Sequence, residues 1–279
     1  MSSGVVANSV RRPPVNLLDT YVRGWHESAE SIVALAAELD AADWARQTDC
    51  TEWTVKDVLA HLAHLESELC RSEQSTYDST GGSDVVSAYT ALGVEARRDR
   101  TPAELVEEFA AAVDLRAARL ADLPDDPAAP APVTPGGVAW SWDTLLRNRS
   151  VDVWVHEQDI RRATGRPGGL DSTGAHVAVM TFSFAMPFVL GKKVRPPATS
   201  TVRWNVTGET PLELVVRIGE DGRASAIETL DEPSATLTMS TETFTVLTAG
   251  RRAPDQVDVA VEGDEELARA TLGAMAIMS

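Results

Sequence analysis

The chain has 279 residues, of which 43% are hydrophobic and 24% charged, and this is typical of a soluble globular protein long enough for two domains. Its formal net charge of -17 disfavours phosphate backbones and anionic membranes as partners. Because the 25 Lys and Arg residues are scattered rather than gathered into a stripe, we expect no nucleic-acid partner.

We expect neither membrane insertion nor secretion. No apolar run approaches the roughly 18 residues that a membrane span needs. Residues 1–16 lack the apolar centre of a secretory signal, so we expect a cytoplasmic location. The two cysteines, Cys50 and Cys70, are not part of a CxxC motif, and in a cytoplasmic chain we expect them to be free thiols without a redox role.

The first half of the sequence predicts helices. Apolar residues recur at helical spacing over residues 15–40. A second helix is expected to begin after Thr54, which can serve as N-cap while Asp57 occupies the N3 position of a capping box. Local side-chain chemistry therefore defines the start of this second helix.

A third helix is predicted after Thr101. Pro102 follows at N1 and Glu104 at N3, and the helical pattern continues to about Leu120. The stretch 124–135 is rich in Pro and Ala and is predicted to be a loop.

Two more helices are predicted after this loop. One spans residues 141–164 and ends near Gly165, and an apolar one follows over residues 172–190. Residues 191–198 contain two Lys and two Pro residues and are predicted to be an interdomain linker. We therefore expect residues 15–190 to form a bundle of four or five antiparallel helices.

Residues 199–279 are predicted to form a second, smaller α+β domain. The hydrophobic period changes there from helical spacing to alternation, which is typical of half-buried strands. Strands are expected at 202–206, 212–218, 224–229 and 236–239. A helix, a last strand and a closing helix are expected at 241–249, 257–261 and 264–275.

Polar side chains interrupt the apolar face of the predicted helix 141–164. Asp152, His156 and Asp159 lie within or beside its apolar stripe on a helical wheel. Burying a carboxylate and an imidazole without partners costs several kcal/mol, and the i, i+4 spacing of Asp152 and His156 suits two ligands of one metal ion. Asp159 is expected to accept a hydrogen bond behind a ligand or to pair with an arginine.

His61 is the candidate for a third ligand. It lies at the edge of the apolar stripe of the helix that begins after Thr54, where a side chain can face a crevice between helices. If the two helices are neighbours, His61, Asp152 and His156 supply two imidazoles and one carboxylate, the donor set of a catalytic zinc with an open fourth position.

The other histidines have alternative interpretations. His64 and Glu68 form a competing i, i+4 pair, but both project toward the polar side of their helix, where we expect a solvated face. His26 and His176 are expected to be surface or boundary residues without a role in the site.

Two sequence motifs carry a family resemblance. The string Trp53-Thr-Val-Lys-Asp-Val-Leu-Ala-His61-Leu is followed about ninety residues later by Val151-Asp-Val-Trp-Val-His156-Glu-Gln-Asp159-Ile. This pair resembles the mycothiol-dependent maleylpyruvate isomerase family, whose N-terminal domain is a DinB-like metal-binding helical bundle. Residues 199–279 are similar to the C-terminal domain of that family, which has a sterol-carrier-protein-like fold, through Trp204-Asn-Val-Thr-Gly208, Phe244 to Leu247, Gly250-Arg251 and Glu262-Gly-Asp264-Glu-Glu-Leu-Ala.

The resemblance implies a multidomain fold: an all-α DinB-like four-helix bundle over residues 15–190, then a small α+β sterol-carrier-protein-like domain over residues 199–279. It also implies that His61, Asp152 and His156 bind zinc. The family has Glu at the acidic position, so Asp152, one methylene shorter, needs a closer approach of its helix to reach the metal.

The resemblance further implies that an arginine of the C-terminal domain holds the substrate. Arg251, which follows Gly250, is the first candidate, and Arg217 is the alternative. The net negative charge of the chain makes such a local cation necessary for a dianionic substrate.

Three functions remain open from the sequence. In the isomerases that the chain resembles, mycothiol adds to the conjugated double bond of maleylpyruvate, the resulting single bond rotates, and the thiol leaves. If the adduct is retained, the same zinc-activated thiol makes the protein a mycothiol S-transferase for detoxification or natural-product biosynthesis. In the third, the metal is structural and the C-terminal domain of a non-catalytic protein binds a lipid-like ligand. The sequence determines neither the physiological substrate, nor the metal, nor the oligomeric state.

Overall fold

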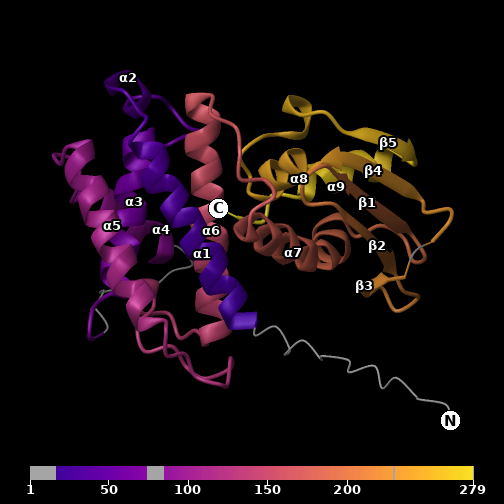
Figure 1. The fold of residues 1–279 in the computed structure, drawn as a ribbon. Coiled ribbons are helices and arrows are strands. Elements are labelled where there is room, and N and C mark those ends of the chain that lie inside the picture. Colours follow the sequence, from indigo (N-terminus) through magenta and orange to yellow (C-terminus); the bar gives the residue numbers. More distant parts are fainter. Residues whose placement is uncertain (1–16, 74–84, 229, 279) are drawn as a thin grey trace, which may run out of the picture.

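The protein consists of a helical N-terminal part followed by a part built on a mixed β-sheet (Figure 1). The computed structural model describes residues 17–73, 85–228 and 230–278, and the side chains of 85–88 are not described. Residues 15 and 16 of the predicted first helix therefore lie outside the described residues. The predicted order of the two regions, first helical and then α+β, is confirmed.

Four long helices form the core of the N-terminal part. They are α1 (Leu17–Ala36), α3 (Val55–Leu69), α5 (Pro102–Arg119) and α6 (Trp142–Thr164). Helix α1 packs on α6 and α5, and α3 packs on α5 and α6, so that the four surround one apolar core. Two shorter helices, α2 (Ala41–Trp44) and α4 (Val85–Glu95), were not predicted, and α4 packs against α3.

Side-chain caps define the ends of these helices as predicted. Thr54 is the N-cap of α3 and forms a capping box with Asp57, and Thr101 does the same for α5 with Glu104. Helix α6 ends at Gly165, whose φ of 66° is left-handed and is readily adopted by glycine. These caps fix where α3 and α6 begin and end, and therefore which residues of the two helices face each other.

Helix α7 (Thr173–Phe188) connects the two parts of the molecule. It contacts α1 and α6 on one side and strands β2 and β3 on the other. The chain then continues as a π-helix, η2 (Val189–Val194), so the predicted linker 191–198 is wrong over its first four residues. Lysine is a good helix former, and the two lysines that suggested a linker lie in this helical turn.

The segment Thr173–Val194 also corrects the expectation that no apolar run is long enough for a membrane span. It is 22 residues long and contains an 18-residue window with a mean hydropathy of 1.5, which satisfies the length and composition of such a span. However, 56% of the apolar window is buried inside the protein, as is usual for a core helix.

The C-terminal part contains a five-stranded sheet with the order β3-β2-β1-β4-β5. Its strands are β1 (Thr201–Thr207), β2 (Leu212–Ile218), β3 (Ala224–Ile227), β4 (Ala235–Ser240) and β5 (Ala260–Gly263). Strands β1 and β4 pair in parallel and the other neighbours pair antiparallel. Helices α7, α8 (Thr241–Thr248) and α9 (Glu265–Ala274) contact the sheet, and Trp204 and Phe244 are fully buried in the core.

The predicted strands at 202–206, 212–218 and 236–239 agree with β1, β2 and β4 to within one residue at each end. The strand predicted at 224–229 ends at Ile227, and residue 229 lies outside the described residues. Strand β5 was expected at 257–261 but spans Ala260–Gly263. All four of its residues are exposed, so no buried alternation marks the strand, and its position depends on backbone pairing with β4.

Two glycines allow α7 to lie close to α1 and α6. A Cβ atom at Gly174 of α7 would lie 2.6 Å from Ser28 Oγ and 2.9 Å from Trp154 Cδ1, which belong to α1 and α6. A Cβ atom at Gly24 of α1 would lie 3.2 Å from the backbone of Gly174. The position of α7 between the two parts therefore depends on the absence of side chains at these residues.

We predict that Gly174→Ala lowers the free energy of unfolding by about 1–3 kcal/mol, because the added methyl group forces three packed helices apart. Urea denaturation measures the change. Gly273→Ala is the matched control: this residue lies in α9 and its Cβ would meet no atom within 4 Å, so the variant should be neutral or more stable. Equal stability of Gly174→Ala and the wild type would contradict the packing described above.

Candidate metal centre

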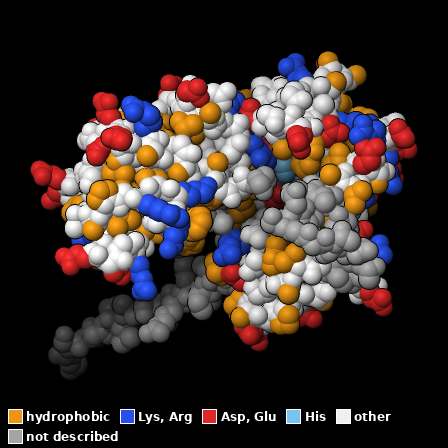
Figure 2. Space-filling view, turned by 180° about the vertical axis from the view of Figure 1, so that it is seen from behind, with side chains coloured by type: hydrophobic (Ala, Val, Ile, Leu, Met, Phe, Trp, Pro, Cys, Tyr) orange, Lys and Arg blue, Asp and Glu red, His pale blue; other side chains and the backbone are white. Residues whose placement is uncertain are grey.

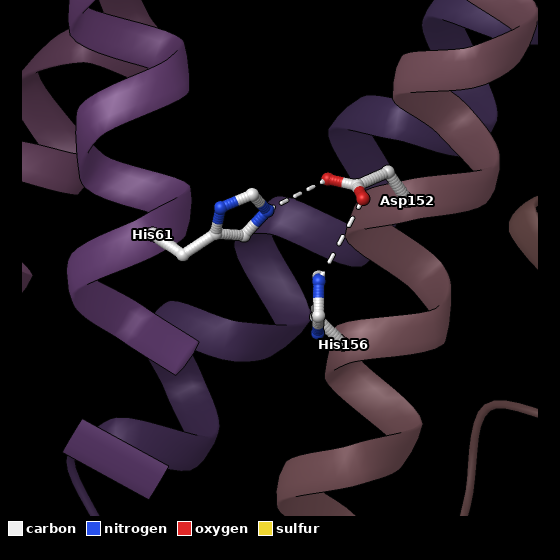
Figure 3. A group of neighbouring side chains, drawn as sticks. All are labelled: His61, Asp152 and His156. Carbon is white, nitrogen blue, oxygen red and sulfur yellow. Dashed lines mark hydrogen bonds and ion pairs between the residues drawn. The ribbon is translucent and has the colours of Figure 1, made fainter. Parts of the chain in front are cut away.

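The three predicted ligands come together where α3 and α6 lie side by side. His61 projects from α3, and Asp152 and His156 project from successive turns of α6 (Figure 3). His61 Nε2 lies 3.3 Å from Asp152 Oδ2, and His156 Nε2 lies 3.6 Å from Asp152 Oδ1. One donor atom of each residue lies within 4.8 Å of the other two. The structure thus brings together side chains that are about ninety residues apart in the sequence.

The site is largely enclosed but not closed. The side chains of His61 and His156 are each 5% exposed, whereas that of Asp152 is 23% exposed. The indole ring of Trp53, the residue before the N-cap of α3, lies 4.8 Å from the His61 ring and 5.7 Å from the His156 ring. Figure 2 shows histidine surface beside basic side chains where the two parts of the molecule meet. The two imidazoles are therefore held rigidly, and the carboxylate is the more accessible group.

Asp159 fixes the orientation of the His156 ring. The Nδ1–H group of His156 donates to Asp159 Oδ2 at 3.1 Å, and this leaves Nε2 directed at Asp152. Asp159 is fully buried and also accepts hydrogen bonds from Arg162 Nη2 at 2.7 Å and from Arg251 Nε at 3.1 Å, and Arg251 Nη2 lies 3.0 Å from Asp159 Oδ2 as an ion pair. Asp159 therefore accepts a hydrogen bond from the candidate ligand His156 and is the ion-pair partner of two arginines.

These contacts determine the protonation state of Asp159. Burial alone would raise its pKa, but the hydrogen bond from His156 and the positive charge of Arg251 lower the pKa to about 2. Asp159 is therefore a carboxylate at neutral pH. It acts as a permanent acceptor for the imidazole.

Asp152 is likewise held as a carboxylate. Burial disfavours its charge, yet the positive charge of Arg149 and the contacts with His156 and His61 keep its pKa well below the usual range. Arg149 Nη1 donates to Asp152 Oδ2 at 2.6 Å. The sequence analysis missed Arg149, although its position three residues before Asp152 on one helix was a local signal.

His61 is a neutral imidazole. Complete burial outweighs the attraction of Asp152 and lowers the pKa of His61 to about 4. Its Nδ1 atom is buried and has no hydrogen-bond partner among the described residues. At neutral pH the ring is therefore uncharged, which is the form that binds a metal ion.

The residues present fit a divalent metal ion. His61 Nε2 and His156 Nε2 lie 3.3 and 3.6 Å from the two different oxygens of Asp152. One donor atom of each residue lies within 4.8 Å of the other two, which is close enough for one ion to contact all three. Two imidazoles and one ionised carboxylate also form a typical donor set for three-ligand zinc sites.

The structure distinguishes the two candidate arginines. The side chain of Arg251 is 8% exposed, and it contacts Asp159 and the carbonyl oxygen of Ala249. It therefore reaches the site through Asp159 and links the C-terminal part to His156. Arg217 is an exposed residue of β2. A substrate-binding role for Arg251 stays a prediction.

The predicted environment of His64 is wrong. Arg97 Nη1 donates to His64 Nδ1 at 3.2 Å, and the ring of Tyr89 lies 4.9 Å from the His64 ring. Helix α4, which was not predicted, brings Tyr89 over this face of α3. Glu68 is partly exposed and pairs with Arg71 at 3.6 Å. His64 is therefore packed between Arg97 and Tyr89 and does not lie on a solvated face.

Comparison with known proteins agrees with the predicted resemblance. Residues 25–161 match the model of the mycothiol maleylpyruvate isomerase N-terminal domain. The match covers most of the helical region, and the resemblance based on the two motifs is confirmed. No curated protein sequence matches the chain significantly.

Two solved structures have a similar fold. One is a crystal structure of the mycothiol-dependent maleylpyruvate isomerase, with a TM-score of 0.56 and 14% sequence identity, covering 88% of this chain and 92% of that one. The other is a histidine-to-alanine mutant of that isomerase, with the same TM-score and identity, covering 87% of this chain and 92% of the mutant. At this identity the likeness establishes the fold, and it extends over both parts of the molecule.

We predict that the metal-free protein loses stability as the pH falls from about 6.5 to about 4. In this range His61 binds a proton in the unfolded chain, where its pKa is 6.5, but not in the folded chain, where the pKa is about 4. The titration of His61 should therefore lower the free energy of unfolding by roughly 3 kcal/mol over this pH range. Chemical denaturation at a series of pH values measures the slope.

His61→Asn should remove most of this pH dependence, because the side chain that titrates is absent. His176→Asn should keep the wild-type slope, since His176 is exposed and its ring contacts the carbonyl oxygen of Ser172. An unchanged slope in His61→Asn would show that His61 is not a buried neutral imidazole.

Proposed function

We propose that the protein is a zinc- and mycothiol-dependent enzyme that activates the thiol for addition to an electrophilic small molecule, as in cis–trans isomerisation of maleylpyruvate-like substrates. The observation that carries this proposal is the convergence of His61, Asp152 and His156 on one point. The N-terminal domain family and the fold of the isomerase structures support the choice of thiol and reaction.

Under this proposal His61 Nε2, one oxygen of Asp152 and His156 Nε2 hold the metal. A bound zinc ion with three protein ligands supplies positive charge at an open position and lowers the pKa of a thiol that binds there. Asp159 keeps His156 in the correct orientation, and Trp53 shields both imidazoles from water. The partly exposed Asp152 lies on the side from which a thiol and a substrate would enter.

We also propose a finer description of the two parts. The helical part, assigned to residues 15–190, is a DinB-like four-helix bundle, and the α+β part, assigned to 199–279, is a sterol-carrier-protein-like domain. The mutual packing of α1, α3, α5 and α6 supports the first assignment. Similarity to the isomerase structures over both parts supports the second. A low-molecular-weight thiol cosubstrate is in keeping with the expected cytoplasmic location.

A catalytic role agrees better with the contacts of Arg251 than a binding role does. A ligand-binding protein with a structural metal would need no arginine of the C-terminal part near the metal ligands. Arg251 instead lies against Asp159, which contacts His156. A set of three protein donors is typical of catalytic zinc sites, whereas structural sites usually have four, and this also favours catalysis over a closed structural site.

The reaction is tested by incubating the zinc-loaded protein with mycothiol and maleylpyruvate while the isomer ratio and the free thiol are both measured. We predict conversion to the trans isomer with the thiol recovered unchanged. Consumption of the thiol in equal amount to the substrate would instead identify an S-transferase. Neither change, with zinc bound, would contradict the proposed thiol activation for this substrate.

Two variants give the matched comparison. His156→Ala should contain no zinc and no activity, because it removes a ligand, while its circular dichroism stays helical. His176→Ala should keep both zinc and activity, since His176 is exposed and lies on α7. Unchanged zinc content in His156→Ala would refute the assignment of the ligands.

A further inference from the structure

A chain of buried charges runs behind the candidate metal centre. Glu66 of α3 is fully buried and receives hydrogen bonds from Trp25 Nε1 at 3.1 Å and from Arg149 Nη2 at 2.7 Å. Arg116 of α5 pairs with its other oxygen. Arg149 then reaches Asp152 through Nη1 at 2.6 Å. The side chains of Arg149 and Arg116 are 3% and 4% exposed.

The charges in this chain balance only when Asp152 is included. Glu66 alone faces two guanidinium groups, those of Arg116 and Arg149. Asp152 supplies the second negative charge, and Arg149 is the group that touches both carboxylates. Buried ion pairs of this kind are weak contributors to stability compared with apolar side chains of the same volume. We therefore expect the buried ion pairs of Glu66 and Arg149 to do more than hold the helices together.

The geometry of Arg149 supplies such a role. Its guanidinium is planar and has fixed donor directions, and Glu66 fixes its position from the far side. It binds Oδ2 of Asp152, the oxygen that also faces His61, and so sets the plane of the carboxylate. With this plane fixed, Oδ1 faces His156 Nε2. An Asp side chain has one rotatable bond fewer than a Glu side chain. The hydrogen bond from Arg149 further restricts rotation of the Asp152 carboxylate.

We propose that Arg149 is a positioning residue of the metal centre: anchored by Glu66, it holds the Asp152 carboxylate in the orientation that meets the metal together with His61 and His156. The inference rests on the proposed function, because it requires these three residues to bind a metal ion. The Glu66–Arg149 ion pair is then part of the metal centre. Arg116 then balances the charge of Glu66 and lies over the Trp25 ring, without a contact to Asp152 in the described structure.

The test compares Arg149→Met with Arg116→Met, two variants that each remove one buried guanidinium from Glu66. Arg116 has no hydrogen bond to Asp152, so it is the matched control. Competition with a chelator measures zinc affinity, and the visible absorption of the Co²⁺-loaded protein reports coordination geometry. Removal of a residue that orients a ligand typically weakens metal binding 10–100-fold.

We expect Arg149→Met to lose about 10–100-fold in zinc affinity relative to Arg116→Met and to change the Co²⁺ spectrum. Arg149→Lys, which keeps a donor for Asp152, should recover part of the affinity, and it replaces the Met variant if that variant does not fold. Equal zinc affinity and identical Co²⁺ spectra in the Arg149 and Arg116 variants would overturn the inference while leaving the proposed function intact. Absence of metal binding by the wild-type protein would overturn both.

Discussion

The candidate metal centre depends on keeping the partly buried Asp152 carboxylate charged between helices α3 and α6. The free-energy cost of that burial is offset by contacts with Arg149, His61 and His156, and these tie α3 to α6 at the site. His61, in contrast, is kept neutral, because burial lowers its pKa. One enclosed environment therefore yields both an anionic oxygen donor and an uncharged nitrogen donor, the combination that a divalent metal ion requires.

The two parts of the molecule meet through this same environment. Arg251 of the C-terminal part contacts Asp159, and Asp159 orients His156, so the sheet-containing part contributes to the geometry of a centre built on helices. Arg252 adds a second link by pairing with Asp49 in the loop before α3, at 3.1 Å. Displacement of the C-terminal part would therefore remove a partner from the residue that holds the His156 ring.

Features set by local chemistry could be predicted from the sequence. The caps at Thr54 and Thr101, and the inward position of Asp152 and His156 on α6, follow from spacing along one helix. The meeting of His61 with that pair required α3 and α6 to be neighbours, which local spacing leaves open. The contact between Arg149 and Glu66, which are 83 positions apart, escaped prediction for the same reason. The exposed edge strand β5 lacked the buried alternation that reveals a strand.

X-ray absorption at the zinc edge, recorded on the zinc-loaded protein before and after addition of mycothiol, tests the central claim most directly. The account predicts nitrogen and oxygen ligands alone at first, with imidazole scattering from two rings. A single sulfur ligand at about 2.3 Å should then appear with the thiol. A coordination shell that is complete without the thiol and unchanged by it would contradict thiol activation at this centre.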